Sequence, residues 1–189
     1  MRAFIAIELP DSVRRQFSEI VAQLRKTGVK ATWVQPDRMH LTLRFLGDVQ
    51  KEQIDIIADA LQQPLSLHDA FSLVSDGLGA FPNLRRPSVI WAAIAPLDPN
   101  LARVQQFVET AARSAGLAAE TKVYHPHVTL ARVRNPAAAR ALGAAVESYP
   151  AFRTDAFDVS HVSLFLSELT PRGPVYTRIH EFPMKRSVS

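Results

Sequence analysis

One four-residue pattern occurs twice in this chain of 189 residues, and it constrains the fold more than any other feature. The first copy is His-Leu-Thr-Leu at residues 40–43, and the second is His-Val-Thr-Leu at residues 127–130. Each copy lies in an apolar stretch typical of a strand, and each is followed, after a short turn, by a helical pattern. A duplicated structural unit explains this agreement better than chance recurrence does.

The spacing within each copy places its polar side chains together. Successive side chains of a strand point to opposite faces, so His40 and Thr42 share one face while the aliphatic residues between and after them face a core. His127 and Thr129 share a face in the same way. If the two units pack about an approximate twofold axis, both polar faces meet across one groove, and two imidazoles and two hydroxyls face a single ligand.

The remaining hydrophobic pattern predicts the α+β class with antiparallel sheets. The expected strands are residues 4–7, 31–34, 40–46, 71–78, 88–95, 126–133, 152–159, 161–166 and 175–182, and the expected helices are residues 11–28, 54–61, 99–114 and 136–148. A regular strand-helix alternation with a glycine-rich first turn is missing, which argues against a doubly wound α/β fold. The chain length predicts one compact domain, residues 1–189.

Composition excludes several classes of site. The chain has no cysteine, which excludes disulfides, zinc thiolates, iron-sulfur clusters and thiol nucleophiles. Twenty-two Lys and Arg residues against 18 Asp and Glu residues give a net charge of +4, which favours an anionic partner. The apolar runs are too short for a membrane helix, and the amino terminus does not resemble a signal peptide. We therefore expect a cytoplasmic protein that has no membrane contact and is a monomer.

Two imidazoles in one groove suit in-line displacement at phosphorus. In that reaction one group takes a proton from the attacking oxygen while another gives a proton to the leaving oxygen. Imidazole titrates near pH 6.5, so one neutral and one charged ring can coexist near neutral pH. His40 and His127 can therefore supply both proton transfers without a metal ion, and the threonine hydroxyls can hydrogen-bond the other phosphate oxygens.

Five segments of the chain, in order, resemble the two-histidine (2H) phosphoesterase superfamily, and within it the LigT-like RNA 2′,3′-cyclic phosphodiesterases, also called 2′-5′ RNA ligases. The segments are MRAFIAIELP, TWVQPDRMHLTLRFLGDV, GLGAFPNLRRPSVIWAAI, YHPHVTLARV and LFLSELTPRGPVY. The resemblance covers nearly the whole chain. It implies two pseudo-symmetric α+β lobes, each an antiparallel sheet with helices packed on its outer face, with the duplicated motifs facing a central groove.

The resemblance also implies an activity and roles for the motif residues. Members of the family hydrolyse a 2′,3′-cyclic phosphate on an RNA or nucleotide to a 2′-phosphomonoester. The implied roles are proton donation to the 3′ oxygen by His40 and proton acceptance from water by His127, with Thr42 and Thr129 contacting the phosphate. The expected partners are RNA ends or nucleotides that bear a cyclic phosphate, and no metal or cofactor is expected.

One arginine completes the phosphate site that the resemblance implies. Arg132 matches a family arginine that neutralises phosphate charge, a task that suits a guanidinium group. Strict alternation, however, places Arg132 on the face of Val128 and Leu130, away from the groove. Its role therefore requires a strand end, a twist or a β-bulge before it. Arg44 is the alternative candidate, because it is in phase with His40 and Thr42.

Other functions stay open from the residues alone. The same site could join RNA ends through a 2′-5′ bond, and a basic chain with aromatic residues could bind RNA ends without catalysis. A metal-dependent phosphatase would need gathered ligands, and the His-x-His pair of His125 and His127 is a candidate. Pro126 and the missing nearby carboxylates argue against that site.

Aromatic side chains could also contribute to nucleic-acid binding. Four of them could stack on a base: Trp33, Phe45, Phe81 and Tyr124. Aromatic residues on strands are usually part of the core, so we expect core positions for all four.

Overall fold

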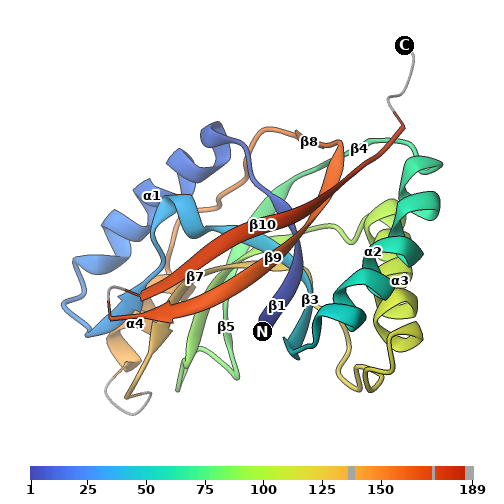
Figure 1. Ribbon diagram of the computed structural model, residues 1–189. Helices are drawn as coiled ribbons and strands as arrows, with labels where there is room; N and C mark the ends of the chain where they lie inside the picture. The colour runs from blue at the N-terminus through green and yellow to red at the C-terminus, as the bar shows by residue number, and fades with distance from the viewer. Residues whose placement is uncertain (136–138, 172, 186–189) are drawn as a thin grey trace.

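The computed structural model describes residues 1–135, 139–171 and 173–185, and these residues form an α+β fold (Figure 1). The strands are β1 (Arg2–Glu8), β2 (Ala31–Trp33), β3 (His40–Asp48), β4 (Phe71–Leu73), β5 (Ser75–Phe81), β6 (Val89–Ile94), β7 (His127–Val133), β8 (Phe157–Val159), β9 (His161–Thr170) and β10 (Gly173–Pro183). The helices are α1 (Asp11–Arg25), α2 (Lys51–Ser66), α3 (Pro99–Ser114), α4 (Arg140–Glu147) and the short 3₁₀ helix η1 (Pro36–Arg38). The predicted fold class is therefore confirmed.

The main sheet consists of two antiparallel halves joined at its centre. Its strands follow in the order β10-β9-β1-β3-β7-β6-β5, and β2 pairs with β7 as the eighth strand. The halves meet where Leu41 of β3 pairs with Val128 of β7, so the two copies of the sequence motif form the central pair of strands. The predicted lobes are thus two parts of one continuous sheet.

The helices follow the same twofold relation as the strands. Helices α1 and α3 follow β1 and β6, whereas α2 and α4 follow the motif strands β3 and β7. In space α1 contacts α4 and α2 contacts α3, and the two pairs lie at opposite ends of the sheet (Figure 1). Each pair therefore combines one helix from each half of the chain, as a twofold axis between the halves requires.

Local capping explains where two of the helices begin. Asp98 precedes α3, and its carboxylate accepts hydrogen bonds from the backbone N–H groups of Asn100 and Leu101. At α2, Gln50 and Gln53 form a reciprocal capping box. Apolar side chains at helical spacing then bury one face of each helix in a single connected core. No helix among the described residues is long and apolar enough to cross a membrane.

Three expected elements differ from the structure. The strand predicted at residues 71–78 is interrupted at Val74, and its two parts, β4 and β5, belong to different sheets, since β4 pairs with β8 alone. The strand predicted at residues 152–159 contracts to β8. The predicted helix 136–148 is described from Arg140 to Glu147, and residues 136–138 lie outside the described part of the chain.

Candidate active site

The pairing of β3 with β7 brings the two predicted histidines to one face of the sheet. Because Leu41 lies opposite Val128, His40 lies opposite Thr129 and Thr42 lies opposite His127. Leu41 and Val128 are fully buried and face the core, whereas the four polar residues are half-buried on the other face. The two histidines are diagonal neighbours, about 7–8 Å apart at the backbone. That spacing allows their rings to approach one phosphate group from two sides.

Each motif strand contains a β-bulge directly after its threonine. In β3, Ala6 and Ile5 of the neighbouring strand pair with Thr42 and Arg44, so Leu43 has no partner. In β7, Trp91 and Ile90 pair with Thr129 and Ala131, so Leu130 has no partner. Each extra residue reverses the alternation of the side chains that follow it. The bulges therefore turn the fifth residue after each histidine, Phe45 or Arg132, toward the groove.

The two candidate arginines lie in different environments. Arg132 is exposed on the groove face. The bulge at Leu130 turns it to this face, as its proposed contact with the phosphate requires. Arg44 is only 8% exposed on the opposite face, where its guanidinium forms an ion pair with Glu109 of α3 and donates a hydrogen bond to the Ala118 carbonyl. The Arg44 guanidinium is therefore already paired, although part of this side chain lines the cavity beside His127. Its burial with the core-facing residues differs from the alternation argument, because Leu43 changes the phase of the strand.

Backbone carbonyls fix the orientation of both rings in the same way. The Nδ1 atom of His40 lies 2.8 Å from the carbonyl oxygen of Arg38, and the Nδ1 atom of His127 lies 2.6 Å from the carbonyl oxygen of His125. A carbonyl only accepts hydrogen bonds, so Nδ1 carries the hydrogen in each ring. Nε2 is then the atom of each imidazole that remains to take or give a proton.

Aromatic side chains surround each imidazole. The ring of His40 stacks on Phe4, with 4.7 Å between the centroids, and meets Tyr176 edge-on at 5.4 Å. The ring of His127 lies edge-on to Phe81 at 5.1 Å and 6.1 Å from Trp91. These four residues come from β1, β10, β5 and β6, which are distant from the motifs in sequence. From the sequence only Phe81 was considered, as a stacking candidate expected in the core, and the other three were not assigned to the site.

Burial lowers the pKa of both histidines. It lowers the pKa of His40 to about 4, although the hydrogen bond to the Arg38 carbonyl acts in the opposite direction. Burial also lowers the pKa of His127, and the hydrogen bond to the His125 carbonyl again opposes it. The charge of Arg132 lowers the pKa of both rings, which places this guanidinium within electrostatic reach of both. Before an anion binds, both rings are therefore mainly neutral at pH 7.

The proposed metal-binding pair is not supported by neighbouring ligands. Among the described residues, the one group of side chains whose ligand atoms lie close enough to share a cation is Glu8, His161 and Glu181. Arg178 already forms ion pairs with both of these carboxylates, so a guanidinium occupies the place of a cation beside them. His125 is exposed and does not belong to this group.

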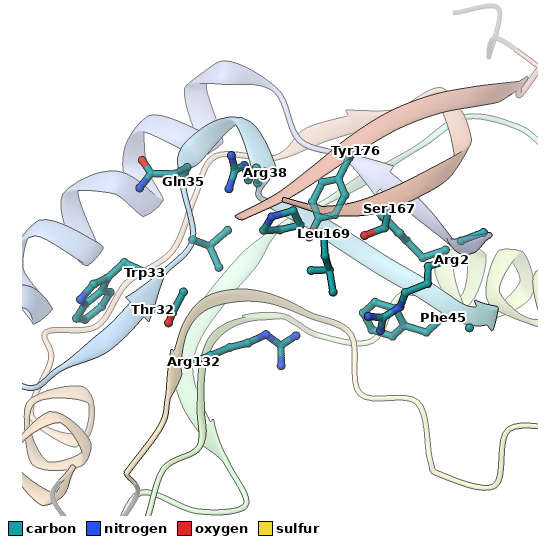
Figure 2. A pocket seen from close by; sticks show the side chains of 15 residues that line it. Arg2, Thr32, Trp33, Gln35, Arg38, Phe45, Arg132, Ser167, Leu169 and Tyr176 are labelled. Carbon is teal, nitrogen blue, oxygen red and sulfur yellow. The ribbon is translucent and has the colours of Figure 1, made fainter. Parts of the chain in front are cut away.

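Two cavities flank the histidines. The cavity beside His40 has a volume of about 560 Å³ and is lined by Arg2, Trp33, Arg38, Phe45, Arg132 and Tyr176, among others (Figure 2). The other cavity has a volume of about 780 Å³ and is lined by Thr42, Phe45, Phe81, Tyr124 and His127, among others. Both volumes lie in the range of sites for small molecules, roughly 300–1,000 Å³.

The aromatic candidates divide into packed and exposed side chains. Trp33 and Tyr124 pack against the core, and the Tyr124 hydroxyl donates a hydrogen bond to the Thr42 carbonyl. Phe81 is half-buried against His127. Phe45, in contrast, is 64% exposed and lines both cavities, so its predicted core position is wrong. The bulge at Leu43 explains the error, because it turns Phe45 out of the core.

Comparisons with known proteins agree with this architecture. The model of the family "LigT like Phosphoesterase" matches residues 7–91 and 94–176, and each segment contains one motif. An RNA 2′,3′-cyclic phosphodiesterase from Thermotoga maritima is 34% identical over 182 residues, which cover 96% of this chain and 94% of the relative. The crystal structure of TT0787 from Thermus thermophilus superposes with a TM-score of 0.81 at 26% identity and covers all of both chains.

A further solved structure extends the likeness in fold. Escherichia coli LigT, crystallised with 3′-AMP, superposes with a TM-score of 0.78 at 23% identity over 97% of this chain and 96% of LigT. The family model covers far more than half of the residues, and each of its two segments contains one of the two central strands, β3 or β7. The chain therefore belongs to the LigT-like phosphoesterase family, a branch of the 2H phosphoesterases.

Proposed function

We propose that this protein hydrolyses the 2′,3′-cyclic phosphate at the end of an RNA or nucleotide to a 2′-phosphomonoester. The observation that carries the proposal is the placement of His40 and His127 on one face of the sheet, each with Nδ1 held by a carbonyl and Nε2 left for chemistry. The relatives named RNA 2′,3′-cyclic phosphodiesterase support the reaction class.

The reaction requires one proton to be taken and one to be given. In our proposal Nε2 of His127 takes a proton from water as the water oxygen attacks phosphorus. The bond from phosphorus to the 3′ oxygen breaks on the opposite side, and Nε2 of His40 gives its proton to that oxygen. The product carries a 2′-phosphate and a 3′-hydroxyl group, and the two rings exchange their protonation states until solvent restores them.

The remaining groove residues would hold the phosphate. Thr42 and Thr129 lie opposite the histidines on the same face, where their hydroxyls can donate hydrogen bonds to non-bridging oxygens. Arg132 would neutralise the charge that develops on those oxygens. These groups supply the proton transfers and the positive charge from protein side chains, so the proposed mechanism requires no metal ion.

Mutation of the histidines tests the mechanism. We expect His40→Ala and His127→Ala each to lower the turnover of 2′,3′-cyclic AMP by at least about 10²-fold. His68→Ala is the matched control, because His68 lines neither of the two cavities. The assay contains excess chelator and identifies 2′-AMP as the product. Near-normal rates in either motif variant, or activity that disappears with chelator, would reject the mechanism.

A substrate with sulfur in place of the bridging 3′ oxygen tests the separate roles. A thiolate leaves without needing a proton, because the pKa of a thiol is far below that of an alcohol. We expect this substrate to restore much of the activity lost in His40→Ala and little of the activity lost in His127→Ala. The reverse pattern would show that His127 is the proton donor and His40 the proton acceptor, and it would not contradict the hydrolysis reaction itself.

End joining is the second candidate function, and the cavity beside His127 favours it. A 5′-hydroxyl group in the place of water would give a 2′-5′ bond between two RNA ends at the same site. The cavity of about 780 Å³ on this side could admit the nucleoside that carries such a hydroxyl. Incubation with one RNA that ends in a cyclic phosphate and another that begins with a 5′-hydroxyl separates joined from hydrolysed products.

A further inference from the structure

The cavity beside His40 contains a concentration of positive charge that the proton chemistry does not need. Arg2, Arg38 and Arg132 line it, and no acidic residue from the described part of the chain does. Among the described residues, none of these three arginines takes part in an ion pair. Three uncompensated guanidinium groups around one cavity repel one another, which favours an anionic ligand.

Several contacts place the three arginines around one point. The charges of Arg132, Arg38 and Arg2 all act to lower the pKa of Tyr176, which burial raises. Tyr176 in turn contacts the ring of His40. The guanidinium of Arg38 lies so close to the backbone of Gly173 that a Cβ atom on Gly173 would approach Arg38 Nη1 to 2.6 Å. Figure 2 shows Arg2, Arg38 and Arg132 on different sides of the space below Tyr176.

The second cavity has a different charge. Its lining contains Arg44, Glu120 and Lys122, and Arg44 is already paired with Glu109 outside the cavity. Its remaining acidic and basic groups are nearly balanced. The twofold relation of the backbone therefore does not extend to the electrostatics, and a polyanion would be attracted to the cavity beside His40.

The proposed reaction places the substrate on the same side. His40 gives its proton to the 3′ oxygen of the terminal nucleoside, so that nucleoside lies nearer to His40 than to His127. The next phosphate in an RNA chain is attached to the 5′ oxygen of this nucleoside. Phe4 and Tyr176 contact the His40 ring and also line the arginine-rich cavity, so the two spaces adjoin.

We propose that Arg2 and Arg38 bind the phosphodiester on the 5′ side of the terminal nucleoside, and that this cavity makes the protein select RNA chains over mononucleotides. This inference rests on the proposed function. Arg132 stands between the reacting phosphate and this second phosphate and acts on the first. The Arg38 carbonyl also accepts the hydrogen bond from His40 Nδ1, so the residue that binds the second phosphate also orients the proton donor.

The test removes the charge from the ligand and from the protein in turn. The ligands are the dinucleotide ApA with a 2′,3′-cyclic phosphate end and the same molecule with an uncharged methylphosphonate linkage. We expect the wild-type protein to have a kcat/KM roughly tenfold higher for the charged linkage. In Arg2→Gln and Arg38→Gln this preference should fall toward one, and in the double variant it should disappear.

Controls separate the subsite from general charge and from folding. Arg15→Gln removes the same charge from the exposed surface of α1, outside both cavities, and should keep the tenfold preference. Arg38→Lys keeps the positive charge and should keep part of the preference for the charged linkage. In addition, the slope of log affinity against log salt concentration should decrease by about 0.7 for each lost phosphate contact. Thermal unfolding of each variant identifies any loss of folding.

Two results would overturn the inference. The first is a wild-type protein that treats the charged and uncharged linkages equally, and the second is an Arg15→Gln variant that loses as much preference as Arg2→Gln. Binding is also measured with ApA that ends in a 2′-phosphate, in both linkages. If the wild-type protein turns over no cyclic phosphate, the proposed function fails, whereas these binding constants still decide whether the arginines read the internal phosphodiester.

Discussion

The protonation of His40 should depend on whether an anion occupies the groove. Burial between Phe4 and Tyr176 lowers the pKa of His40 to about 4 in the free protein. With that pKa, roughly one ring in a thousand carries the second proton at pH 7. A negative charge about 5 Å from the ring, at an effective dielectric constant of 20, favours the charged ring by roughly 3 kcal/mol. Bound phosphate should therefore raise the pKa by about two pH units, to near 6.

Nitrogen NMR of the histidine rings measures this change directly. At pH 5 the ring of His40 should be mainly neutral in the free protein and mainly charged with saturating inorganic phosphate. Phosphate should also bind more tightly at pH 5 than at pH 7, because proton and anion binding are linked. In Arg132→Gln the pKa of His40 and of His127 should both rise in the free protein, since the guanidinium charge lowers both. A His40 ring that titrates near pH 6.5 without phosphate would refute the burial argument.

Two further predictions concern stability and base recognition. The unfolded chain binds a proton on His40 near pH 6.5 and the folded protein does so only near pH 4, so the free energy of unfolding should fall by about 1.5 kcal/mol between pH 6.5 and pH 5. Urea unfolding at the two pH values should show a smaller fall in His40→Phe, and an equal fall in both proteins would contradict the assignment. Phe45→Ala should lower kcat/KM for a cyclic-ended dinucleotide by about tenfold, because base stacking on an exposed aromatic ring contributes roughly 1–3 kcal/mol. Phe45→Trp should retain activity, and an unchanged Phe45→Ala would exclude stacking.

The sequence was sufficient for the parts of the site that depend on local alternation. His40 with Thr42, and His127 with Thr129, share a face as their spacing predicts, and the aliphatic residues beside them are buried. The hydrophobic pattern along the chain also correctly predicted an α+β fold with antiparallel pairing. These predictions succeed because the period of a strand is a property of its own backbone.

The positions of Arg44, Phe45 and Arg132 could not be predicted in the same way. They depend on the bulges at Leu43 and Leu130, and a bulge is defined by the residues of the neighbouring strand. No glycine or proline marks either bulge in the sequence. The repeated motif did contain a usable signal. The proposed role of Arg132 required a bulge in the second copy, and a duplicated unit should have the same bulge in the first copy. A bulge within residues 40–46 predicts that Phe45 faces the groove and Arg44 faces the core.

The aromatic neighbours of the histidines were also beyond local reasoning. Phe4 and Trp91 reach the rings through pairing of β1 with β3 and of β6 with β7. Gly79 illustrates the dependence on tertiary structure, because a Cβ atom there would overlap the Trp91 ring at 2.2 Å. A small residue in one strand therefore makes the space for the ring of another, and nothing in the local pattern of either strand indicates it.

The twofold relation explains the pair of histidines, but a symmetric site would not distinguish the two oxygens of a cyclic phosphate. A symmetric groove would accept the phosphate in two orientations, and either imidazole could then meet the 3′ oxygen. The side chains break this equivalence, because the two matching bulges place Phe45 at one related position and Arg132 at the other. An uncharged ring and a guanidinium offer the phosphate and the nucleoside different surroundings on the two sides. We therefore expect the identity of these two residues, more than that of the histidines, to decide which imidazole donates the proton.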